Sequence, residues 1–132
     1  MIKIGRMYKF ESAHFLPNHE GKCKNMHGHQ WKVEVVVKGY PIVDGDRAEY
    51  GMVMDYKRLD EIVDPLIFMF DHKVINDLLP NPTAENIALK LAVKIPDFLP
   101  NKVALVKVRV WESENSYAEW TDGPGKEADE NI

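Results

Sequence analysis

The sequence predicts an α+β domain in which a mainly antiparallel sheet carries helices on one face. Residues 27–40 alternate apolar and polar side chains, as a strand with one buried face does. Residues 54–67 and 87–95 place apolar residues three and four positions apart, which favours helices. Further strand-like segments lie before and after these regions. The order strand, strand, helix, helix, strand, strand is typical of the α+β class.

The first part of the chain is expected to form two strands joined by a polar loop. Residues 2–15 alternate, and their even-numbered positions end in Ser12 and His14. Residues 16–26 contain a proline and a glycine, which interrupt regular structure. Residues 27–40 then form the second strand.

Two helices are expected in the middle of the chain. The first opens near Asp55, and Pro65 falls inside it, so we expect a kink or two helical pieces. The second begins at Thr83, whose hydroxyl suits an N-cap, and it ends at Pro96 and Pro100.

The remaining segments complete the sheet. We expect strands at residues 103–112 and 116–121, so that residues 1–121 form a single domain. Residues 122–132 are charged and rich in glycine, which favours a mobile tail. Four short strands leave exposed edges, which association into a closed ring of sheets would cover.

Composition excludes several classes of function. The chain has 17 basic and 21 acidic residues, a net charge of -4 and no basic stripe, which disfavours a nucleic-acid partner. No apolar run is long enough to cross a membrane. The N-terminal residues lack the pattern of a signal peptide, and one cysteine cannot form an intrachain disulfide. We therefore expect a cytoplasmic protein.

Three histidines form a candidate metal site. His27 and His29 are two residues apart, so on a strand they point the same way. They share that face with four apolar residues, namely Trp31, Val33, Val35 and Val37. His14 ends a similar face on the preceding strand. Three histidines with a fourth position open are the ligand set of a catalytic zinc. Taken singly, each histidine would be assigned to the core or the surface, and His19 in the loop is an alternative ligand.

Cys23 lies four residues before His27, close enough for the loop to bring its sulfur near the metal. A nearby cation lowers the pKa of a thiol, so Cys23 is a candidate base or nucleophile. Two alternatives stay open. Cys23 could be a fourth zinc ligand, which would make the site structural, or simply a small buried residue.

Two further carboxylates, those of Asp71 and Glu112, are candidate site residues. Asp71 precedes His72, and a carboxylate that hydrogen-bonds an imidazole is used in proton relays, although a plain turn is the alternative. Glu112 ends the apolar face of the strand at 103–112, where an unpaired carboxylate would be costly. A ligand with adjacent N–H donors, such as a 2-amino-4-oxo heterocycle, would satisfy it. The alternatives are an exposed strand end or an ion pair with Lys107 or Arg109.

Taken in order, these residues resemble the signature of the 6-pyruvoyltetrahydropterin synthase family. The matching elements are His14, Cys23-x-x-x-His27-Gly-His29, Asp71-His72, Asn81-Pro82-Thr83-Ala84-Glu85-Asn86 and Val110-Trp111-Glu112. The resemblance covers roughly residues 3–120. It implies the tunnelling fold (T-fold), in which trimers close a barrel and two trimers stack as a homohexamer with active sites between subunits.

The resemblance also implies a role for each residue of the site. His14, His27 and His29 would bind Zn²⁺, and Cys23 would be the proton acceptor. Asp71 and His72 would form the relay and could serve a neighbouring subunit's zinc. Glu112 would anchor the pterin, with Thr83 and Glu85 as secondary contacts. Pyruvoyl synthases often have a second hydroxyl residue where this chain has Ala84.

The implied activity is that of a zinc-dependent lyase. The short gap between Cys23 and His27 resembles the 6-carboxytetrahydropterin synthase branch. That enzyme converts 7,8-dihydroneopterin triphosphate to 6-carboxy-5,6,7,8-tetrahydropterin, acetaldehyde and triphosphate, for queuosine or archaeosine synthesis. The nearest rival is 6-pyruvoyltetrahydropterin synthase, which eliminates triphosphate without carbon–carbon cleavage. A non-catalytic zinc or pterin-binding module is the rival from another class.

Overall fold

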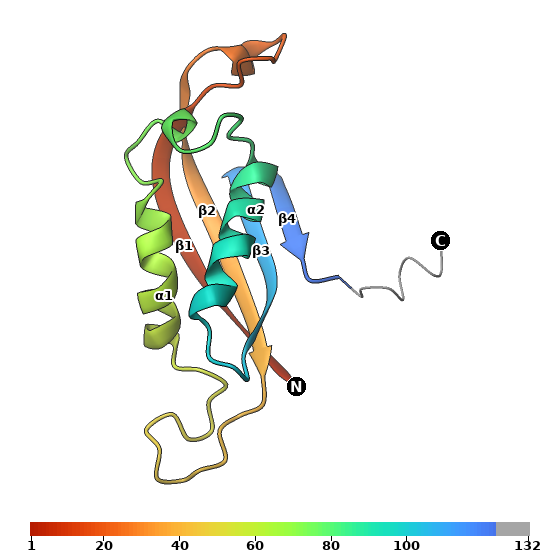
Figure 1. Ribbon diagram of the computed structural model, residues 1–132. Coiled ribbons are helices and arrows are strands. Elements are labelled where there is room, and N and C mark those ends of the chain that lie inside the picture. The colour runs from red at the N-terminus through yellow and green to blue at the C-terminus, as the bar shows by residue number, and fades with distance from the viewer. Residues whose placement is uncertain (124–132) are drawn as a thin grey trace, which may run out of the picture.

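The structure, a computed structural model, describes residues 1–123 and is built on a four-stranded antiparallel sheet. The strands lie in the order β1-β2-β3-β4. They are β1 (Ile2–His14), β2 (His27–Gly39), β3 (Ala104–Ser113) and β4 (Ser116–Thr121). Helices α1 (Tyr56–Phe68) and α2 (Ala84–Lys94) lie on one face of the sheet (Figure 1). The α+β prediction is confirmed. The predicted mobile tail lies, apart from its first two residues, outside the described residues.

Alternating side chains of the two long strands form the centre of the core. In β2, Trp31, Val33, Val35 and Val37 are fully buried. From β1, Tyr8 and Phe10 point to the same side, and the Phe10 ring stacks on Trp31 with 5.8 Å between the ring centroids. Helix α1 packs on β1, while α2 packs on β3 and β4. The face of β2 that carries His27 and His29 is therefore the face turned toward the helices.

Both helices begin where the sequence placed their starts, and the N-cap predicted at Thr83 is confirmed. The Asp55 carboxylate accepts a hydrogen bond from the Lys57 N–H at 2.9 Å, and the Thr83 hydroxyl accepts one from Asn86 N–H at 3.1 Å. Of the two outcomes expected at Pro65, a kink or two helical pieces, the second is wrong, because α1 runs through this residue as one helix. Pro65 and the residue four positions before it are exposed, so water can bind the carbonyl that lacks its usual donor.

None of the helices within residues 1–123 is long and apolar enough to span a membrane.

Strand register determines which residues meet at one end of the sheet. In the β1–β2 pairing, His14 lies opposite His27 and Ser12 lies opposite His29. The β3–β4 pairing shifts register between Trp111 and Ser113, so Glu112 sits at a bulge. Bulges re-aim side chains and are frequent beside functional sites. The three predicted histidines and Glu112 are therefore brought to the same end of the sheet.

Candidate metal centre

The three imidazoles converge from two adjacent strands. His14 at the end of β1 and His27 at the start of β2 have ring centroids 4.5 Å apart. The His29 centroid is 5.2 Å from that of His14 and 4.7 Å from that of His27. Because the three residues share the helix-facing side of the sheet, their ring nitrogen atoms point into one small space.

Backbone carbonyls orient two of these rings. Nδ1 of His14 lies 2.7 Å from the carbonyl oxygen of Pro82, and Nδ1 of His27 lies 2.7 Å from that of Asn25. A carbonyl oxygen can only accept, so each Nδ1 carries the hydrogen and donates it. Nε2 of a neutral ring then keeps its lone pair. Histidine ligands of metals are usually held by such an outer hydrogen bond.

The remaining nitrogen atoms of the cluster fit a metal ion. Nε2 of the fully buried His14 and Nε2 of His29 have no hydrogen-bond partner within residues 1–123. Buried polar atoms rarely stay unpaired. Burial lowers the pKa of His29 below its ordinary value, and the neighbouring His27 and His14 lower it further, while Glu112 opposes this shift. A neutral imidazole is the form that binds a metal.

Glu112 supplies a fourth donor where the sequence predicted an open position. Its Oε1 lies 3.1 Å from His29 Nε2 and 3.4 Å from His14 Nε2. One ligand atom from each of His14, His27, His29 and Glu112 lies within 4.8 Å of all the others, so the group could hold a metal ion. Three histidine ligands with an open fourth position therefore stay a prediction, and Glu112 is a further possible ligand that the sequence did not indicate.

The alternative ion pairs of Glu112 do not form. Lys107 Nζ lies 2.5 Å from Glu34 Oε1, and Arg109 Nη2 lies 2.6 Å from Glu119 Oε1. Both cations have the opposite strand parity to Glu112, as the sequence indicated. Glu112 thus keeps its carboxylate free for the histidines and for the cavity described below.

Cys23 and His19 lie outside the group of possible metal ligands. Cys23 is half-buried on a short 3₁₀ turn, Lys22–Lys24. His19 uses Nδ1 to accept a hydrogen bond from Gly21 N–H at 2.9 Å. The closed site with sulfur as fourth ligand is not formed. The proposed role of Cys23 as a base stays a prediction.

Asp71 and His72 form the expected pair, at the outer edge of β1. His72 Nδ1 lies 2.9 Å from Asp71 Oδ1, and Asp71 also accepts the Glu11 N–H at 3.0 Å. These two hydrogen bonds, that of Glu11 first, hold the pKa of Asp71 below its ordinary value. His72 has φ of 54°, a conformation that few residues other than glycine adopt. This conformation lets adjacent side chains meet, and the imidazole is 74% exposed.

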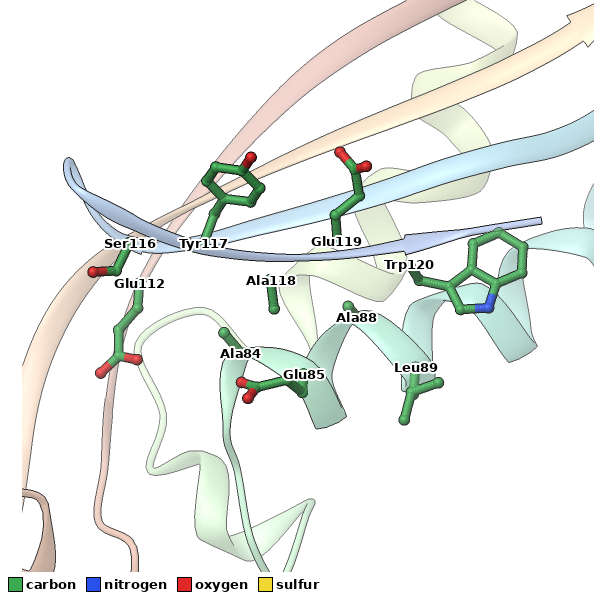
Figure 2. A pocket seen from close by; sticks show the side chains of 10 residues that line it. All are labelled: Ala84, Glu85, Ala88, Leu89, Glu112, Ser116, Tyr117, Ala118, Glu119 and Trp120. Atoms are coloured by element: carbon green, nitrogen blue, oxygen red, sulfur yellow. The ribbon is translucent and has the colours of Figure 1, made fainter. Parts of the chain in front are cut away.

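A cavity of about 480 Å³ adjoins the cluster between α2 and β4. Figure 2 shows Glu112 and Glu85 on the helix side of the sheet, whereas Tyr117 and Glu119 point away from it. Ala84 also lines the cavity. Its volume is in the range of small-molecule sites. Thr83 is not among the lining residues and uses its hydroxyl to cap α2, so its predicted ligand contact stays a prediction.

A larger cavity, of about 800 Å³, lies at the opposite end of the sheet, between residues 40–44 and 100–104. It contains no histidine and only ordinary surface charges. The size of a cavity therefore does not identify the candidate site. The buried histidine nitrogen atoms without hydrogen-bond partners do. The sequence did not predict that the backbone carbonyls of Asn25 and Pro82 orient two of the histidines, because every residue has a carbonyl whatever its type. It also missed the approach of Glu112 to the histidines, which depends on the bulge.

Comparison with known proteins identifies the family. The sequence profile of 6-pyruvoyl tetrahydropterin synthase matches residues 3–122. The chain is 39% identical over 97 residues to 6-carboxy-5,6,7,8-tetrahydropterin synthase of Synechocystis, covering 71% of this chain and 74% of that protein. It is 36% identical over 103 residues to dihydroneopterin monophosphate aldolase of Pyrococcus furiosus, covering 78% and 82%.

A solved structure agrees on the fold. The 6-pyruvoyl tetrahydropterin synthase of Caenorhabditis elegans superposes with a TM-score of 0.76 at 23% identity, over 92% of this chain and 96% of that one. The profile match spans almost all of the described residues, and it includes every residue of the histidine cluster. The chain belongs to the 6-pyruvoyl tetrahydropterin synthase family.

Proposed function

We propose that this protein is a zinc-dependent synthase that converts 7,8-dihydroneopterin triphosphate to 6-carboxy-5,6,7,8-tetrahydropterin, acetaldehyde and triphosphate. The observation that carries the proposal is the set of unpaired Nε2 atoms of His14 and His29 beside a cavity lined by Glu112 and Glu85. Nitrogen donors of this kind suit Zn²⁺. The two carboxylates that line the cavity suit the N–H groups of a pterin ring.

The residues of the site have distinct tasks in this reaction. Bound Zn²⁺ would make the protons of the substrate's hydroxylated side chain more acidic. Cys23, as a thiolate, accepts a proton from that side chain. His72 donates Nδ1–H to Asp71, and its Nε2, 3.8 Å from Glu11 Oε2, exchanges a proton at a second position. Glu112 accepts hydrogen bonds from the pterin ring and fixes its orientation.

The branch of the family rests on two observations. Three residues separate Cys23 from His27, the spacing that carries the resemblance to the 6-carboxytetrahydropterin synthase branch, and the Synechocystis relative carries that name. The product would enter queuosine or archaeosine synthesis. The alternative of 6-pyruvoyltetrahydropterin synthase shares the metal site and stops before carbon–carbon cleavage.

A second candidate function follows from the Pyrococcus furiosus relative, which is named dihydroneopterin monophosphate aldolase. An aldolase would cleave the three-carbon side chain after its first carbon. It would leave a hydroxymethyl group on the pterin and release a phosphorylated two-carbon aldehyde. This reaction would use the same pterin cavity, so the phosphate chain of the substrate and the products separate the two.

One assay distinguishes these reactions. Zinc-loaded protein is incubated with dihydroneopterin triphosphate and, separately, with the monophosphate, and the products are identified by mass. Acetaldehyde and 6-carboxytetrahydropterin support the main proposal. A 6-pyruvoyl product without acetaldehyde supports the first alternative, and phosphorylated glycolaldehyde from the monophosphate supports the second. Tight pterin binding with none of these products would indicate a non-catalytic pterin-binding module.

We also propose a homohexamer, acting in the cytoplasm, with active sites shared between subunits. Among the described residues, β4 pairs only with β3, and the outer edge of β1 is bonded only near its end, by residues 71–74. The Asp71–His72 pair is exposed along that edge of β1. The cavity lies instead on the β4 side. Mixing inactive Cys23→Ala and His72→Ala chains tests this assembly. Shared sites would restore part of the activity, whereas independent sites would restore none.

A further inference from the structure

The carboxylate of Glu112 faces two imidazole nitrogen atoms that have no hydrogen-bond partner. Nδ1 of His14 lies 2.7 Å from the Pro82 carbonyl oxygen, so Nε2 is the nitrogen of this ring that remains for a metal. Glu112 Oε1 lies 3.4 Å from this atom and 3.1 Å from His29 Nε2, and neither nitrogen makes a hydrogen bond in the described chain. A cation bound among these three atoms would attract all of them.

Glu112 has neither a lysine nor an arginine partner in the part of the chain described. The basic side chains near it are His14 and His29, while Lys107 and Arg109 are engaged by other carboxylates. A half-buried carboxylate without a countercharge is unfavourable. Binding to the metal would supply that countercharge.

Glu112 is also placed to leave the histidines. It lies at the bulge between β3 and β4, beyond the last β2–β3 pair, Lys32 with Trp111. Its side chain is 29% exposed, in contrast to the fully buried His14, and it lines the cavity between α2 and β4 (Figure 2). One carboxylate therefore borders both the metal ligands and the space where a pterin would bind.

We infer that Glu112 is the fourth metal ligand of the substrate-free protein and that a pterin entering the cavity draws it off the metal. This inference rests on the proposed function. It adds that the Glu112 carboxylate exchanges the metal for the pterin when the pterin binds. The same carboxylate closes the site at rest, protecting it from adventitious ligands. It opens a coordination position only when the correct heterocycle has bound.

Cobalt-loaded protein tests the inference without turnover. Co²⁺ replaces Zn²⁺ in such sites and reports its ligands through visible absorption bands. Metal affinity and spectrum are compared for the unmodified protein, Glu112→Gln and Glu114→Gln. Glu114 is an exposed carboxylate on the same hairpin and serves as the matched control. Circular dichroism verifies that all three proteins fold.

We expect Glu112→Gln to weaken Co²⁺ binding about 100-fold and to change the spectrum, since even groups that only support a ligand change affinity by about 10- to 100-fold. Glu114→Gln should match the unmodified protein. Equal affinity and an identical spectrum for Glu112→Gln would overturn the inference.

The second half of the experiment adds unsubstituted pterin, which has no side-chain hydroxyl to bind the metal. Its binding is followed by its own fluorescence, and the cobalt bands are recorded in parallel. We expect the bands to shift in the unmodified protein and not in Glu112→Gln. Pterin that binds without shifting the bands would refute the exchange alone. Pterin that does not bind at all would refute the proposed function, whatever ligand role Glu112 has in the free protein.

Discussion

Strand β1 carries two polar clusters toward the helices, and they differ in whether their atoms satisfy one another. Near its middle, Arg6 donates to both carboxylate oxygens of Asp60 at 3.1 Å, and the Tyr8 hydroxyl donates to the same carboxylate at 2.8 Å. Burial and this hydrogen bond raise the pKa of Tyr8, so its hydroxyl stays a donor. These three side chains pair with one another.

At the end of the same strand, the histidine cluster is incomplete. His14 and His29 keep buried nitrogen atoms without partners, and Glu112 approaches them without donating or accepting a hydrogen bond. The difference separates a cluster that contributes to folding from one that requires a ligand. Four predictions test this contrast, beginning with the largest expected effect.

Replacing a metal ligand should remove both metal and activity. We expect His29→Ala to lower Zn²⁺ affinity by more than about 100-fold and to abolish turnover, because it removes a direct ligand. His29 is only half-buried, so the fold should persist. Zinc content after gel filtration measures the effect. His19→Ala is the matched control and should bind zinc normally. Full zinc retention in His29→Ala would contradict the assigned ligand set.

Replacing Cys23 should separate chemistry from metal binding. We expect Cys23→Ala to lower turnover by about 10²- to 10⁴-fold, the usual contribution of a positioned acid or base, while zinc content stays stoichiometric. The thiol lies outside the ligand group, which is the reason for the split. Loss of zinc from this variant would show that sulfur is a ligand after all.

Removing the metal should destabilise the protein through the histidine cluster alone. A metal at about 100 times its dissociation constant adds about 2.7 kcal/mol to the free energy of unfolding. We expect a chelator to remove that stabilisation from the unmodified protein and from Asp60→Asn equally. Urea unfolding with and without chelator measures it. An effect of the chelator on His29→Ala as large as on the unmodified protein would place the metal elsewhere.

The stability that the Arg6–Asp60–Tyr8 cluster contributes should depend on pH and not on the metal. The hydrogen bond from Arg6, more than that from Tyr8, lowers the pKa of Asp60 below 3.8, although burial opposes it. The contribution of the Asp60 carboxylate to the free energy of unfolding is therefore present above pH 3.8. It is lost as the pH falls through the lower pKa that Asp60 has in the folded protein.

For this partly exposed pair we expect Asp60→Asn to reduce the free energy of unfolding by about 0.5–1 kcal/mol at neutral pH. Denaturant unfolding between neutral and strongly acidic pH would measure the difference between the two proteins, which should vanish at the acidic end. A difference that persists there would show that packing, rather than charge, accounts for the effect. Zinc content should be the same in both proteins.

Local patterns in the sequence were enough to predict the elements and most of the candidate site. Alternation placed His27 and His29 on the buried face of β2, and the two helices start at Asp55 and Thr83, where their starts were expected. These features depend on neighbours a few residues away. The break expected at Pro65 did not occur, because whether a helix tolerates proline depends on the exposure of the freed carbonyl.

The sequence by itself determined which possible metal ligands exist and which face of its strand each occupies, because side-chain direction along a strand repeats every two residues. Only the tertiary structure decided which of these ligands come together. Register set His14 opposite His27, a bulge carried Glu112 to them, and a left-handed backbone at His72 turned its ring toward Asp71. Each of these depends on pairing between distant segments, which no spacing within one segment can specify.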